Sequence, residues 1–95
     1  MAKFVSVHII ACMTRQDVER LLERFATEES GGVKNLRVQC DTLSGRMVCE
    51  WEAPDRDTLV KWLKNCDVRF RGKSEWLMRV QLESAAGKVV TLTGA

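Results

Sequence analysis

The chain has 95 residues, 45% of them hydrophobic and 29% charged, so it can form one globular domain with a single core but not two. Its 15 Lys and Arg against 13 Asp and Glu give a net charge of +2, which is too balanced to predict nucleic acid or an anionic membrane as a partner. No apolar run approaches the ~18–20 residues that cross a bilayer, and no small-residue cleavage site follows the N-terminal apolar stretch. We therefore expect a cytoplasmic protein.

The first two elements are predicted to be a strand and a helix. Residues 3–12 alternate, so one face of this strand carries Val5, Val7 and Ile9 and the other carries Phe4, Ser6, His8 and Ile10. Thr14 is expected to be the helix N-cap, because Asp17 three residues later approximates a capping box. Apolar residues then recur at helical spacing as far as Phe25, and residues 30–32 (Ser-Gly-Gly) end the helix.

The middle of the chain is predicted to form a hairpin and a second helix. Residues 33–41 and 46–52 alternate as strands. Gly45, in the turn between them, supplies the positive φ that tight hairpin turns need. Pro54 and Asp55 are typical of a helix start, and apolar residues at helical spacing follow them.

A last clear strand at residues 75–83 completes the order β-α-β-β-α-β. This order predicts an α+β sandwich of the ferredoxin-like type, in which two helices cover one face of an antiparallel sheet. The strand order would be 4-1-3-2. We expect residues 1–84 to form this single domain. For the tail at 85–95, two alternatives stay open: a short edge strand or a mobile segment.

The alternation assigns side chains to the two faces of the expected sheet. The apolar face, expected under the helices, carries Val5, Val7, Ile9, Leu36, Val38, Met47, Trp51, Met78 and Val80. The open face carries Phe4, Ser6, His8, Ile10, Arg37, Gln39, Val48, Glu50, Glu52, Leu77, Arg79 and Gln81. It mixes apolar and polar residues, which suits neither a dry core nor a fully solvated surface.

Two interpretations of the open face follow. Its charges can simply pair across strands on a solvated sheet. Alternatively, two subunits pack these faces together into a barrel, with the polar residues lining a pocket between them, because apolar side chains such as Ile10 and Leu77 would otherwise be exposed. The second interpretation predicts a homodimer, a dimeric α/β barrel.

His8 is the only histidine of the chain. On the expected open face it would lie between Glu50 or Glu52 of the third strand and Arg79 or Gln81 of the fourth. A histidine oriented by a carboxylate can act as a general base, and the same pair can begin a metal site. The alternative is a hydrogen-bonded structural histidine.

The four cysteines and a basic loop suggest less specific roles. Cys40 and Cys49 lie on one face of the predicted hairpin, so a disulfide between them is conceivable, but reduced packing thiols are the expectation in a cytoplasmic protein. The basic loop at residues 69–73 is expected to be a solvated turn. The third strand offers glutamates where an RNA-binding sheet of this order carries aromatic residues, so we expect no nucleic-acid partner.

Three segments, MAKFVSVH, SGRMVCEWEAPDRDTLVKWL and EWLMRVQLE, resemble a family of small bacterial domains of unknown function. The most specific part is a turn glycine, a strand cysteine and a Glu-Ala-Pro run, here Gly45, Cys49, Glu52, Ala53 and Pro54. The best understood members are nickel-binding, ferredoxin-like proteins that dimerise through their sheets. The resemblance therefore implies this fold, a homodimer and a sheet face that carries ligands. Nickel-binding members have several histidines, whereas this chain has one.

Three functional hypotheses follow. The leading one is a dimeric module that binds a small molecule on the open face, with polar contacts from His8, Glu50, Arg79, Gln39 and Gln81. The second is a transition-metal site, nickel being the metal that the resemblance implies, with His8, Glu50 and Glu52 as ligands. The third is a cofactor-independent isomerase or monooxygenase with His8 as its base. None of them involves nucleic acid or a membrane.

Overall fold

The computed structural model describes residues 1–28, 31–66 and 76–92. The elements in chain order are β1 (Ala2–Ile9), α1 (Arg15–Thr27), β2 (Lys34–Asp41), β3 (Arg46–Ala53), α2 (Arg56–Lys64), β4 (Leu77–Val80), β5 (Leu82–Ala85) and β6 (Lys88–Thr91). The first six of these have the predicted β-α-β-β-α-β order. The basic loop at 69–73 lies outside the described residues.

Both helices begin where the sequence predicts. Thr14 caps α1 with a capping box, in which its side chain accepts a hydrogen bond from the backbone N–H of Asp17 and the Asp17 carboxylate accepts one from the N–H of Thr14. Asp55 caps α2 by accepting from the N–H of Thr58 at 2.7 Å. These bonds satisfy N–H groups that a helix start otherwise leaves without a partner.

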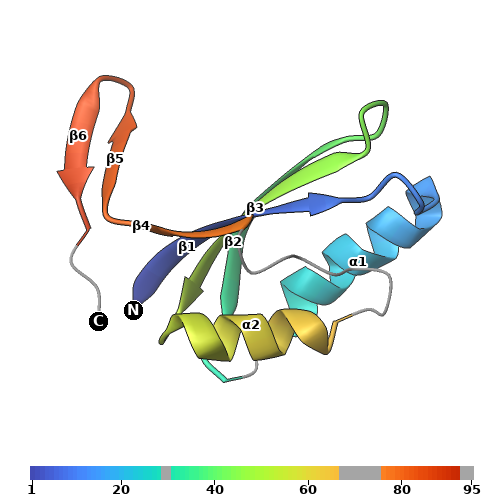
Figure 1. Ribbon diagram of the computed structural model, residues 1–95, viewed down its shortest axis with the longest axis horizontal. Coiled ribbons are helices and arrows are strands. Elements are labelled where there is room, and N and C mark those ends of the chain that lie inside the picture. The colour runs from blue at the N-terminus through green and yellow to red at the C-terminus, as the bar shows by residue number, and fades with distance from the viewer. Residues whose placement is uncertain (29–30, 67–75, 93–95) are drawn as a thin grey trace.

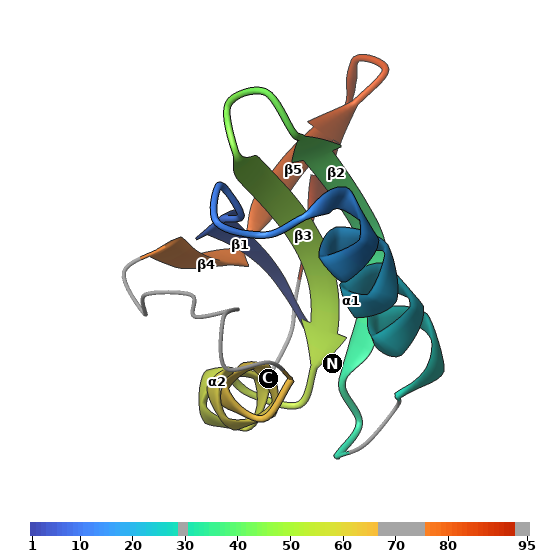
Figure 2. The same ribbon diagram turned by 90° about the vertical axis from the view of Figure 1, so that its right-hand side faces the viewer.

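The main sheet has the strand order β2-β3-β1-β4, with every neighbouring pair antiparallel. This is the predicted order, and both helices cover one face of the sheet (Figures 1 and 2). The fold is therefore the expected α+β sandwich of the ferredoxin-like type. Gly45 has the predicted positive φ of 71° and its carbonyl accepts from the N–H of Ile10 at 2.7 Å, so the β2–β3 turn packs against the end of β1.

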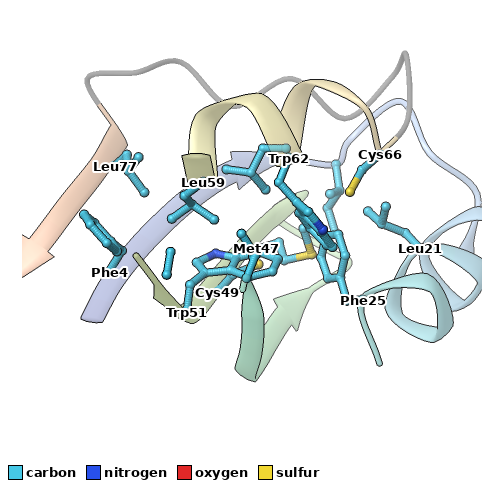
Figure 3. Close-up of a cluster of buried hydrophobic side chains, with 14 of the residues drawn as sticks. Phe4, Leu21, Phe25, Met47, Cys49, Trp51, Leu59, Trp62, Cys66 and Leu77 are labelled. Atoms are coloured by element: carbon cyan, nitrogen blue, oxygen red, sulfur yellow. The ribbon is translucent and has the colours of Figure 1, made fainter. Parts of the chain in front are cut away.

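The core lies between the sheet and the helices (Figure 3). Its centre is an aromatic cluster in which Phe25 of α1 and Trp62 of α2 pack on Trp51 of β3, with ring centroids 4.9 and 5.1 Å from that of Trp51. Trp51 and Met47 are fully buried, as predicted for the helix-covered face of β3. Burial of large aromatic rings of this kind dominates the stability of a small core.

The faces of β1 and β4 are opposite to the prediction. In β1 the residues under the helices are Phe4, Ser6 and His8, followed by Ile10 beyond the strand end, and all are at most 3% exposed. Leu77 of β4, opposite Ser6, is buried with them, whereas Met78, opposite Val5, is 59% exposed. Leu36, also predicted under the helices, falls in a bulge of β2 and is 43% exposed.

The C-terminal strands also depart from the prediction. The expected strand at 75–83 is divided at Gln81 into β4 and β5, and β5 pairs with β6 in a separate two-stranded sheet. The tail thus forms a strand, but this strand does not extend the edge of the main sheet. The hairpin rises from the end of β4 on the side of the sheet away from α2 (Figure 1). We call residues 82–91 the arm.

Candidate functional site

The expected placement of His8 on the open face is wrong. His8 is opposite Met47 in the β1–β3 pairing and is 1% exposed beneath the helices. Glu50 and Glu52 alternate with the buried side chains of β3 and lie on the other face of the sheet. His8 therefore forms neither a base–carboxylate pair nor a common metal site with these two residues.

His8 instead belongs to a buried polar cluster with Ser6 and Trp51. The indole Nε1–H of Trp51 donates to Ser6 Oγ at 2.8 Å, and His8 Nε2 lies within hydrogen-bond distance of the same oxygen at 2.7 Å. Burial lowers the pKa of His8 to about 4, so the ring is neutral near pH 7. This geometry makes His8 a hydrogen-bonded structural histidine, which was the alternative interpretation of the sequence.

Cys40 and Cys49, the two cysteines of the β2–β3 hairpin, do not form a disulfide. Cys40, opposite Met47, and Cys49, opposite Val38, are diagonal neighbours on the helix-covered face, and both are free thiols. Burial raises the pKa of Cys49 to about 12, partly opposed by a hydrogen bond with Ser6. Burial also raises the pKa of Cys40. Thiols with raised pKa values are weak nucleophiles at neutral pH. Cys49 is buried, as expected of a packing thiol, whereas Cys40 is exposed and departs from that expectation.

The open face consists of four rows that follow the strand pairing. From the arm outward, the rows are Lys34, Glu52, Lys3 and Val80; Arg37, Glu50, Val5 and Met78; Gln39, Val48 and Val7; and Asp41, Arg46 and Ile9. We call Val5, Val7, Ile9, Val48 and Met78 the apolar strip. Val7 and Val48 are each 37% exposed and Ile9 is 53% exposed, although they are cross-strand neighbours on one continuous surface.

A cluster of ion pairs lies at one end of the apolar strip. Lys3 Nζ is 2.7 Å from Glu83 Oε1 of β5 and 3.3 Å from Glu50 Oε1 of β3. The hydrogen bond to Glu83 raises the pKa of the Lys3 ammonium above its ordinary value, and Glu50 adds to this. Lys3 is thus a permanent positive charge that joins the arm to the sheet.

A recess of about 110 Å³ adjoins this cluster. It is lined by Met1, Ala2, Lys3, Glu52, Arg79, Val80 and Leu92. Two residues of the predicted site, Glu52 and Arg79, line the recess, and Glu50 contacts its Lys3. The expected placement of Arg79 on the open face is wrong, because Arg79 is opposite Phe4 and shares the helix-covered side of β4 with Leu77. Gln39 is opposite Val48 on the open face, and Gln81 lies between β4 and β5, where its carbonyl accepts from the N–H of Leu92 at 2.8 Å.

Lys3 and Glu83 are absent from the sites predicted from the sequence. The sequence does indicate where Lys3 lies, because Lys3 and the alternate residues Val5, Val7 and Ile9 share one face of β1. Lysine side chains are rarely buried, so a lysine on this face of the strand indicates that the face is exposed to solvent. Glu83 carries no such signal, because its position depends on the bend at Gln81.

The structure is similar to a solved crystal structure, that of SCO4226 from Streptomyces coelicolor A3(2). The TM-score is 0.66 at 21% sequence identity, and the similarity covers 87% of this chain and 100% of that chain. At this identity the likeness shows the fold alone. No family model matches the chain. No curated protein matches it either. Membership in the nickel-binding family therefore stays a prediction.

Within residues 1–28, 31–66 and 76–92, no group of three or more His, Cys, Asp or Glu side chains is placed to hold a metal ion. Among the helices of the same residues, none is long and apolar enough to cross a membrane.

Proposed function

We propose that the chain is a homodimeric binding module, in which the open faces of two copies pack together and enclose a small polar molecule. The apolar strip carries this proposal. Its Val7, Ile9, Val48 and Met78 are between 37% and 59% exposed, whereas the opposite faces of β1 and β3 are buried. Large contiguous apolar patches are uncommon on monomers, and two sheets can bury such patches by packing face to face about 10 Å apart.

The charges beside the strip support a second copy as its occupant. Arg37 of β2 lies beside the strip, Arg46 of β3 lies at the end away from the arm, and Glu50 and Glu52 of β3 lie toward the arm. A two-fold axis places the same surface opposite itself, so a face that carries both signs can pair with its own copy. A face of one sign would repel its copy instead.

The recess supports a small polar molecule as the ligand. Lys3 offers positive charge there and Glu52 offers a hydrogen-bond acceptor, beside the apolar Val80 and Leu92. About 110 Å³ is below the ~300 Å³ of a typical small-molecule site. A second copy over the open face would supply the missing wall, which links ligand binding to dimerisation. No comparable observation favours the metal or enzyme hypotheses, because His8 lies on the opposite face.

The proposal is tested by placing a charge in the apolar strip. Val7→Glu is expected to weaken dimerisation on the order of a hundredfold, because the symmetric interface would have to bury two unpaired carboxylates, one from each copy. Sedimentation equilibrium of wild type and variant measures the dissociation constant.

The matched control is Leu43→Glu, which introduces the same charge at a 98% exposed leucine in the β2–β3 turn. It is expected to change the dissociation constant less than threefold. Equal dissociation constants for Val7→Glu and wild type would contradict the proposed interface.

A further inference from the structure

The arm exposes apolar side chains on both of its faces. In the β5–β6 pairing, Leu82 and Val89 share one face, and they are 65% and 68% exposed. Val90, directly opposite Glu83, is on the other face and is 47% exposed. A lone two-stranded hairpin is marginally stable in water, so this one needs contacts beyond its own.

The position of the arm shows which of its faces borders the open face. Glu83 reaches Lys3 of β1 at 2.7 Å, so the face of the arm that carries Glu83 and Val90 is turned toward the open face of the sheet. The hairpin stands up beside that surface, on the side away from α2 (Figure 1). A molecule bound on the open face would therefore contact Val90, whereas Val89 is on the other face of the arm.

We propose that this molecule is the second copy of the chain and that each arm fastens the dimer by packing its Val90 face against the partner. This inference rests on the proposed open-face dimer. The four rows of the open face hold fewer residues than the roughly 20–30 that each side of a stable interface uses. The arm supplies the missing contacts, and two-fold symmetry uses both arms at once.

A pair of valine substitutions tests the inference. Val90→Ser is expected to raise the dimer dissociation constant about tenfold, because an apolar contact is lost from both arms. Val89→Ser, one residue away on the other face of the arm, is the control and is expected to change it less than threefold. Sedimentation equilibrium gives the dissociation constants, and circular dichroism verifies that both variants retain the wild-type fold.

The possible outcomes distinguish a failure of the proposed role of the arm from a failure of the proposed open-face dimer. A dimeric wild type whose dissociation constant is unchanged by Val90→Ser, or is raised equally by both substitutions, overturns the role of the Val90 face and leaves the open-face dimer standing. A monomeric wild type overturns both. A larger effect of Val90→Ser than of Val89→Ser supports the arm as a fastener.

Discussion

Replacing Ser6 by alanine is expected to lower the free energy of unfolding by about 3 kcal/mol, an unusually large effect for the loss of one hydroxyl. Ser6 Oγ accepts from the Trp51 indole at 2.8 Å and lies 2.7 Å from His8 Nε2, and all three residues are at most 1% exposed. Its removal leaves two buried polar atoms without this partner, at roughly 1–3 kcal/mol each. Urea unfolding followed by tryptophan fluorescence measures the change.

Ser84→Ala is the matched control, because Ser84 of β5 is exposed. It is expected to change the free energy of unfolding by less than about 0.5 kcal/mol. If the two substitutions had similar effects, Ser6 would not hold the buried cluster together.

Acid is expected to destabilise the fold through His8, by about 3 kcal/mol between pH 7 and pH 4. The pKa of His8 is about 4 in the folded chain against 6.5 ordinarily, because burial disfavours the charged ring. Between these values the unfolded chain binds more protons than the folded chain. The stabilisation is therefore complete above pH 6.5 and is lost as the pH falls toward 4. Urea unfolding at a series of pH values, at one protein concentration, measures this loss.

His8→Gln separates this effect from the titration of carboxylates, since glutamine keeps a polar group near Ser6 and does not titrate. Between pH 6.5 and 4.5 its free energy of unfolding should be nearly constant while that of the wild type falls. Parallel curves for the two proteins would show that His8 does not have the lowered pKa.

Most of the main sheet and both helices could be predicted from local signals. Thr14 with Asp17, and Asp55 after Pro54, mark helix starts because their side chains satisfy free backbone N–H groups. Gly45 marks the β2–β3 turn because its φ of 71° strains other residues. Such signals act within a few residues and do not depend on the rest of the fold.

The faces of β1 could not be predicted from alternation alone, because both of its phases are largely apolar. A phase with three β-branched residues looks more like core than one with Ser6 and His8. The choice is decided by tertiary partners: Trp51 satisfies Ser6, which in turn contacts His8. A one-residue error in phase moves every side chain of a strand to the other face. The expected site around His8 was therefore wrong in placement, although Glu50 and Glu52 were placed correctly.

The arm was beyond local prediction for a different reason. Residues 77–85 alternate without an obvious break. Two contacts hold the chain on either side of the bend at Gln81: the hydrogen bond that the Gln81 carbonyl accepts from the N–H of Leu92, and the ion pair of Glu83 with Lys3, a residue distant in sequence. Contacts between residues so far apart along the chain leave no local pattern in the sequence.

β1 is the strand that unites these features. One of its faces anchors the buried cluster through Ser6 and His8, and the other presents Val5 and Val7 to the proposed partner. The buried cluster fixes the phase of β1, and this phase in turn exposes the apolar strip. The stability predictions and the dimer proposal therefore depend on the same register.

Native mass spectrometry of untagged protein, as purified from cells, tests the central proposal most directly. A dimer that carries the extra mass of a small molecule is the expected result, and the mass would identify the class of ligand. A bare monomer at micromolar concentration would contradict the account, because the apolar strip would then be exposed without a partner and the recess would have no second wall.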